Sequence, residues 1–170
     1  IVSSLLDFAR QTRPKKEKHD LNDVIMESVM LTRKQAAFTD VIVEQDLSKD
    51  LPPINVDKDQ IEQALINLTL NAIEATNPGG KITISSRFSS ETDVVEIIVS
   101  DTGKGISGED LDRIFDPFFT TRESGTGLGL AITHGIIEQH GGTIEVESKI
   151  DQGTSFMIRL PLKNGDNNDH

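Results

Sequence analysis

Two glycine clusters, DTGKGI at residues 101–106 and GTGLGL at residues 125–130, organise this chain. The segment between them is rich in aromatic residues and includes FDPFFTTR at residues 115–122. Glycine-dense turns let backbone N–H groups approach an anion closely. The second cluster runs directly into a segment with helical apolar spacing, so its amides would lie at the positive end of a helix. The stretch therefore predicts a nucleotide pocket with a mobile cover.

The strand predicted directly before the first cluster places a carboxylate on an apolar face. Residues alternate from Asp93 to Asp101, so Val95, Val99 and Asp101 should point the same way. A charge on that face is costly unless something pairs with it. We interpret Asp101 as the acceptor for an exocyclic amine such as adenine N6. The alternative is an ordinary strand-end Asp that begins a turn with Gly103.

Two asparagines stand one helical turn apart on a helix predicted from Asp57 to a turn at residues 77–80. Asn67 and Asn71 lie on a polar stripe, whereas Ala75 belongs to the apolar face of the same helix. Amide oxygens are neutral, hard ligands that suit Mg²⁺ sharing phosphate oxygens. The site and a solvated helix surface are both compatible with this pattern.

Candidate phosphate ligands gather around the second glycine cluster. Thr120, Thr121 and Arg122 add donors and one cation, although a solvated Arg is the ordinary alternative. Neither the P-loop pattern nor the dinucleotide fingerprint is present. Thr154, inward on a predicted strand end, is either a further polar contact or an ordinary strand residue. The candidate residues of the cluster are Gly125, Thr126, Gly127, Leu128, Gly129 and Leu130.

Three of the seven phenylalanines, Phe115, Phe118 and Phe119, lie between the clusters. We expect them to form a hydrophobic plug that anchors a lid whose order depends on nucleotide. The four histidines have no metal-ligand spacing, and His140 suits a helix C-terminus, where a cation is favoured.

Composition limits the classes of function. The 170 residues carry a net charge of −11 and no cysteine, which argues against nucleic acid or an anionic membrane surface as partner and excludes disulfides. No apolar run approaches the ~20 residues that cross a bilayer. The chain begins with neither Met nor a signal peptide, so we expect it to be a piece of a longer protein.

Helices alternating with antiparallel hairpins predict an α/β two-layer sandwich, in which a mixed, mostly antiparallel sheet is covered by helices on one face. A short helix should begin after Ser107 and end near Phe115. The remaining predicted helices cover residues 20–38 and 128–140, and the remaining strands cover residues 41–47, 81–88, 143–148 and 154–160.

The ends of the chain differ from its middle. Residues 1–13 have the apolar spacing of a short helix, and Pro14 begins a basic connector over residues 14–19. Residues 20–162 form the predicted domain. Residues 163–170 are a polar tail that we expect to be disordered.

Five segments in order closely resemble the catalytic ATP-binding domain of bacterial sensor histidine kinases. NLTLNA at 67–72 looks like the N box, and residues 101–106 look like the G1 box. FDPFF at 115–119 resembles the F box, residues 125–130 the G2 box, and DQGT at 151–154 the last element. The residues of these segments most resemble those of nitrogen-regulator-type and sporulation-type kinases, which belong to the gyrase/Hsp90/histidine-kinase/MutL superfamily. The resemblance implies a Bergerat-type ATP-binding fold.

The resemblance also implies roles. Asn71 would coordinate Mg²⁺ and Asn67 would support the metal and the phosphates. Asp101 would bind adenine N6, with Thr154 nearby through water. Arg122 stands where the family often has a basic lid residue. Gly103 and Gly105 would shape the adenine pocket, Ile106 would pack on the base, and Gly125, Gly127, Leu128 and Gly129 would present amides to phosphates.

Two departures refine this expectation. Hydrolases of the superfamily have a water-activating Glu where Asn67 stands, and an amide cannot accept that proton. Net ATP hydrolysis should therefore be slow, as suits transfer to a side chain. No His here has the setting of a phospho-acceptor, so residues 1–13 should be the end of a dimerising helical hairpin that carries the acceptor upstream.

The resemblance implies a cytoplasmic domain with two partners: its own dimerisation and phosphotransfer domain, in a homodimer, and the receiver domain of a response regulator. It implies no nucleic acid and no direct membrane contact. A nucleotide-binding scaffold that transfers nothing and an autonomous ATPase remain alternatives, and a protein-serine kinase of the anti-sigma type is a weaker one.

Overall fold

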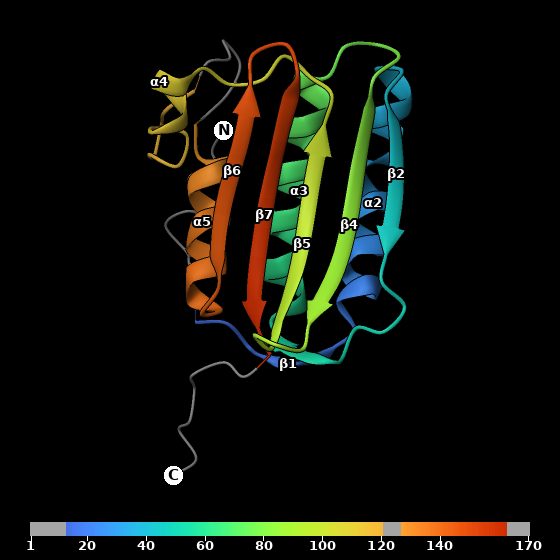
Figure 1. Cartoon of the computed structure of the whole chain (residues 1–170), viewed down its shortest axis with the longest axis vertical. Coiled ribbons are helices and arrows are strands. Elements are labelled where there is room, and N and C mark those ends of the chain that lie inside the picture. Colours follow the sequence, from blue (N-terminus) through green and yellow to red (C-terminus); the bar gives the residue numbers. More distant parts are fainter. Residues whose placement is uncertain (1–12, 121–126, 163–170) are drawn as a thin grey trace.

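The computed structural model describes residues 13–120 and 127–162, and its main feature is a five-stranded sheet (Figure 1). The strands in pairing order are β2 (Ile42–Leu47), β4 (Lys81–Ser89), β5 (Val94–Asp101), β7 (Gly153–Pro161) and β6 (Thr143–Lys149). β2 pairs with β4 in parallel, and every other neighbouring pair is antiparallel. The predicted mixed, mostly antiparallel sheet is confirmed.

Helices cover one face of this sheet. Figure 1 shows α2 (Leu21–Phe38), α3 (Lys58–Ala75) and α5 (Gly129–Gln139) together behind the strands. The opposite face has no helix over it in the described part of the chain. The arrangement is the predicted two-layer sandwich.

Each of three predicted helix starts has its side-chain cap. Asp20 accepts a hydrogen bond from the N–H of Asn22, and Asp57 accepts one from Gln60. Ser107 caps α4 (Gly108–Leu111). The predicted end of this short helix near Phe115 is wrong.

After Leu111 the chain continues in turns, in which the N–H of Arg113 donates to the carbonyl of Asp110 and the N–H of Asp116 to that of Arg113. Ile114 lies in these turns and is buried at 6% exposure.

A small second sheet was not predicted. β1 (Glu17–His19) pairs antiparallel with β3 (Ile54–Val56), inside the stretch predicted as a connector and just before α3. β1 has no alternating apolar pattern, so it forms through backbone pairing with the buried Ile54 and Val56 rather than through its own side chains. The division into stalk, linker, domain and tail stays a prediction, since residues 1–12 and 163–170 lie outside the described part.

The core lies between the helices and the inner face of the sheet. Alternate residues of β5 are buried, as predicted, and the last of them is Asp101. No helix of the described residues is long and apolar enough to cross a membrane. Aliphatic side chains dominate this core, which includes Leu21, Ile25, Ile61, Leu65, Leu68, Ile82, Ile84, Ile97, Ile137 and Ile158.

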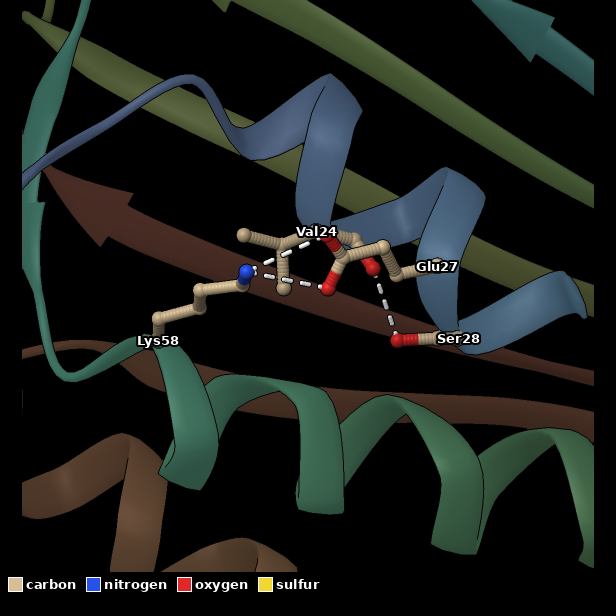
Figure 2. Close-up of polar contacts among 4 residues, drawn as sticks. All are labelled: Val24, Glu27, Ser28 and Lys58. Carbon is tan, nitrogen blue, oxygen red and sulfur yellow. Dashed lines mark hydrogen bonds and ion pairs between the residues drawn. The ribbon is translucent and has the colours of Figure 1, made fainter. Parts of the chain in front are cut away.

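A charged contact joins α2 to α3 at the rim of the core. Figure 2 shows Lys58 Nζ beside the carboxylate of Glu27, at 3.1 Å, and Ser28 Oγ donating to the carbonyl of Val24 at 2.8 Å. The hydrogen bond from Lys58 lowers the pKa of Glu27, whereas burial raises the pKa of neighbouring Glu62. The ion pair bridges the two helices at an exposed edge, where such a pair contributes little to stability.

Candidate functional site

A cavity of about 440 Å³ opens where α3, the end of β5, the start of β7 and the start of α5 meet. Its volume is within the range of small-molecule sites. Residues far apart in the sequence converge there because β5 and β7 pair Asp101 directly with Thr154. Of the predicted site residues, the cavity is lined by Asn67, Asn71, Ala75, Asp101, Gly105, Ile106, Thr120, Gly127, Gly129, Leu130 and Thr154.

Two predicted residues lie behind the lining. Leu128 is buried and stands at the N-terminal end of α5. Gly103 packs its backbone against α3, where a Cβ would come within 2.3 Å of the carbonyl oxygen of Ala75. The other predicted site residues, Thr121, Arg122, Gly125 and Thr126, lie outside the described residues.

Asp101 is the decisive side chain of the cavity. It is 8% exposed, and burial raises its pKa above the usual range of a carboxyl. Its Oδ1 accepts hydrogen bonds from the backbone N–H groups of Gly103, at 2.8 Å, and Thr154, at 3.3 Å. Among residues 13–120 and 127–162, Oδ2 has no hydrogen-bond partner, which leaves that oxygen for a donor on a ligand.

Asn67 is oriented by α5. Its Nδ2 donates to the carbonyl of Gly129 at 3.3 Å and lies 3.5 Å from Thr133 Oγ1, whose own proton is donated to the same carbonyl at 2.8 Å. Both neighbours can only accept from the amide, so the NH₂ group must face α5 and Oδ1 must face away from it.

Thr133 is a residue that the sequence analysis missed. It is fully buried one turn after Gly129, and its hydroxyl helps to fix the amide of Asn67. A threonine four residues after a helix's first glycine carries no recognisable signal by itself. Only the packing of α3 against α5 connects it to the site.

The amide oxygens at the cavity suit a metal cation that binds together with phosphate. The described residues contain no group of three His, Asp, Glu or Cys side chains that could hold a metal ion. Asn67 and Asn71 supply amide oxygens from adjacent turns of α3, and Mg²⁺ commonly takes few protein ligands and completes its shell with water and phosphate oxygens. The residues therefore fit Mg²⁺ bound together with a nucleotide.

The charges of the cavity lining also favour a divalent cation bound together with phosphate. Its lining includes Glu74, Asp101 and Asp110, and Lys104 is the one cation among the described lining residues. A polyphosphate would meet net negative charge there, so a divalent cation would reduce the repulsion. None of Glu74, Lys104 and Asp110 was predicted as a site residue, because Glu74 of α3, Asp110 of α4 and Lys104 between β5 and α4 meet at one cavity only in the folded chain.

Two glycines are required by close backbone contacts. Gly105 has φ of +73°, and a Cβ there would lie 2.1 Å from the carbonyl oxygen of Lys149. Gly127 has the same φ, and its carbonyl accepts a hydrogen bond from the N–H of Phe118 at 2.9 Å. That bond joins residues on the two sides of the 121–126 segment.

The predicted aromatic plug holds for two of its three rings. Phe115 packs against His134 and Phe156, with ring centroids 5.2 and 6.3 Å apart, and Arg113 lies 4.6 Å above the ring of Phe119. Phe118 is exposed and has φ of +69°. Its side chain therefore contributes little to the plug.

His140 is a neutral, buried group and not the predicted cation. It is fully buried, and burial lowers its pKa. Nε2 accepts the N–H of Asp57 at 3.0 Å, and Nδ1 lies 2.7 Å from the carbonyl of Ile136. A ring that accepts at Nε2 and donates at Nδ1 is the neutral tautomer. His140 does follow the C-terminus of α5 as predicted, but it is uncharged there because the fold removes this helix end from water.

Comparison with known families identifies the family to which the chain belongs. Residues 56–164 match the family described as histidine kinase-, DNA gyrase B- and HSP90-like ATPases. The chain belongs to this family. The matched segment runs from the end of β3 through α3, both glycine clusters and the β6–β7 hairpin, so it contains every residue that lines the cavity.

Individual family members are similar along most of the chain. Sensor histidine kinase ZraS of Escherichia coli K12 is 41% identical over 162 residues, which are 95% of this chain and 34% of ZraS. Sporulation kinase A of Bacillus subtilis is 40% identical over 96% of this chain and 27% of its own length. The chain thus spans about a third of the length of the curated relatives it matches.

Solved structures agree with the sequence relatives. The nucleotide-free catalytic domain of histidine kinase ThkA superposes with a TM-score of 0.79 at 35% identity, over 87% of this chain and 96% of that domain. Full-length ShkA in complex with AMPPNP gives a TM-score of 0.86 at 27% identity, over 96% of this chain and 35% of ShkA. ThkA has also been solved in complex with the response regulator protein TrrA. The predicted fold and family are confirmed.

Proposed function

We propose that this chain binds Mg·ATP in the cavity and donates the γ-phosphoryl group to a His on a separate helical domain of a sensor histidine kinase. One observation carries the proposal: the buried carboxylate of Asp101, with Oδ2 open to a ligand donor, shares one cavity with Asn67 and Asn71. A base at one end and a metal-bound triphosphate at the other would occupy that arrangement.

Different residues would position the base of the nucleotide and the metal ion on its phosphates. Asp101 Oδ2 would accept from the exocyclic amine of adenine, while the N–H groups of Gly103 and Thr154 hold the carboxylate in place. Asn67 and Asn71 would hold Mg²⁺ on the phosphates, and the metal would supply charge neutralisation. Phosphoryl transfer depends mainly on in-line positioning and charge stabilisation.

Transfer rather than hydrolysis follows from Asn67. Its amide is committed to Gly129, and an amide has no basic group to activate water. In the reaction an imidazole nitrogen of the acceptor would form the new N–P bond as the bond to ADP breaks. A response regulator would then receive the phosphoryl group, as the ThkA–TrrA complex suggests by analogy. We further propose a homodimeric, cytoplasmic setting for the domain, from the relatives' naming as sensor kinases.

A reconstituted transfer assay tests the proposal. The chain would be mixed with γ-labelled ATP, Mg²⁺ and the parent protein's helical domain carrying the acceptor His, with Asp101→Asn as the matched control. We expect acid-labile label on the helical domain with the wild-type chain and, at an ATP concentration that does not saturate the site, much less with the variant. Bound ATP without transferred label would favour a scaffold, and rapid phosphate release without the helical domain would favour an autonomous ATPase.

A further inference from the structure

Ser148, at the end of β6, lies behind the cavity and joins three parts of its wall. Its Oγ accepts a hydrogen bond from the N–H of Ile106 at 2.7 Å. It lies 3.1 Å from the carbonyl of Gly153 and 2.7 Å from the hydroxyl of Thr154. Ile106 and Thr154 line the cavity, whereas Ser148 does not.

The single proton of Ser148 can be assigned by counting. A serine hydroxyl has one O–H donor and two lone pairs. The N–H of Ile106 can only donate, and the carbonyl of Gly153 can only accept, so the proton of Ser148 points to Gly153. The second lone pair then accepts the proton of Thr154. This is the arrangement in which all three contacts are hydrogen bonds at once.

The direction of these protons determines which hydrogen-bonding groups Thr154 presents to a ligand. Because its proton is donated to Ser148, its hydroxyl turns only lone pairs toward the cavity. Thr154 pairs with Asp101 across β5 and β7, and its N–H donates to Oδ1 of Asp101. The base end of the cavity therefore presents two neighbouring acceptors, the hydroxyl of Thr154 and Oδ2 of Asp101.

We propose that Ser148 is a positioning residue for base selectivity: by orienting the hydroxyl of Thr154, it makes the site favour a purine with an exocyclic amine over one with a carbonyl there. This inference rests on the proposed nucleotide site. Adenine brings N–H donors to two acceptors, directly or through water. Hypoxanthine brings an oxygen, which would face lone pairs with no proton between them. Without Ser148, the hydroxyl of Thr154 can rotate and donate to that oxygen.

Calorimetric titration with Mg·ATP and Mg·ITP tests the assignment, since the two ligands differ at the base alone. For Ser148→Ala we expect the preference for ATP over ITP to fall by about 5-fold, the size of one neutral hydrogen bond. Ser148→Thr, which keeps a hydroxyl, should retain the wild-type preference. Circular dichroism would confirm that each variant is folded.

A double-mutant cycle separates selectivity from support of the loop. Thr154→Val should lower the ATP preference as Ser148→Ala does, and combining the two should add little, because both act through one hydroxyl. Equal weakening of ATP and ITP in Ser148→Ala would overturn the inference and leave Ser148 as a support for Ile106. An unchanged preference in Thr154→Val would overturn it even if Ser148→Ala did not fold. Wild-type chain that binds neither nucleotide would overturn the proposed function itself.

Discussion

The buried carboxylate of Asp101 lowers the stability of the folded chain, but the same carboxylate would stabilise a complex with a ligand amine. The folded chain holds a carboxylate largely out of water, and only one of its oxygens is satisfied by backbone donors. The raised pKa expresses that cost, because burial penalises the charged form. A ligand amine at Oδ2 would remove part of the cost, so binding and folding make opposite demands on this residue.

Replacing Asp101 by Asn should separate those demands. Asn keeps an oxygen for the N–H groups of Gly103 and Thr154 but removes the buried charge, so the unfolding free energy at neutral pH should be unchanged or higher by up to about 1 kcal/mol. The NH₂ group would face the adenine amine donor to donor, and ATP affinity should fall at least ~10-fold.

Urea unfolding and calorimetry on the same samples check both halves of this prediction. Asp110→Asn, at the rim of the same cavity, is the matched control for loss of one negative charge. A strongly destabilised Asp101→Asn, or one that binds ATP normally, would contradict the role assigned to Asp101.

At the scale of elements, the site depends on how α3 and α5 are held together at their far ends. His140 follows α5 and accepts the backbone N–H of Asp57, whose side chain caps α3. Asp57 also accepts the N–H of Lys15, on the segment that leads into β1. One neutral imidazole thus connects both helices that carry the site to the chain that enters the domain.

The His140 contact should make the fold sensitive to mild acid. Burial lowers the pKa of His140 below its ordinary value of 6.5, so the unfolded chain binds a proton more readily than the folded chain. The stabilisation is complete above pH 6.5 and is lost as the pH falls from there through the folded pKa. Its slope cannot exceed about 1.4 kcal/mol per pH unit, the limit for one proton.

Comparison with His140→Gln isolates this slope. The raised pKa of Asp101 acts in the opposite direction at lower pH and is common to both proteins. We expect the variant, which cannot titrate, to lose less unfolding free energy between about pH 7.5 and 5.5 in urea titrations. His134→Gln, half-exposed on the same helix, serves as the control. Parallel curves for wild type and His140→Gln would refute the assignment.

At the scale of the whole molecule, repulsion among negative charges opposes the compact state. The net charge is −11. On the uncovered sheet face, Arg159 of β7 lies 3.0 Å from Glu96 of β5 and 2.9 Å from Glu145 of β6, and Lys81 of β4 lies 3.5 Å from Glu44 of β2. Such partly exposed pairs contribute about 0–1 kcal/mol each, so they do not cancel a chain-wide excess.

Moderate salt should therefore stabilise the folded chain. Between about 20 and 200 mM NaCl the screening length shortens from about 20 Å to about 7 Å, which weakens the repulsion between distant charges more than it weakens close pairs. We expect the urea midpoint to rise over this range at pH 7.5. Arg159→Gln, which removes the bridging cation, should show a larger rise. A midpoint that falls with salt would mean that the ion pairs outweigh the repulsion.

The local and periodic features of this protein can be predicted from its residues alone. Alternation along β5 was enough to place Asp101 on the buried face, and side-chain caps at Asp20, Asp57 and Ser107 were enough to place helix starts. Helical spacing was enough to put Asn67 and Asn71 on one stripe. These features depend on residues within a few positions of one another, which is why they can be read from the sequence.

Contacts between residues far apart in the chain depend on the folded structure. The neutral state of His140 depends on its distance from Asp57, and the orientation of Asn67 depends on Thr133 in another helix. The pairing of β1 with β3 and the proton direction at Thr154 likewise come from contacts across the fold. The glycine-rich stretch 101–130 supplies the turns of the cavity, but burial and hydrogen bonding between elements set the charge and direction of the groups that face a ligand.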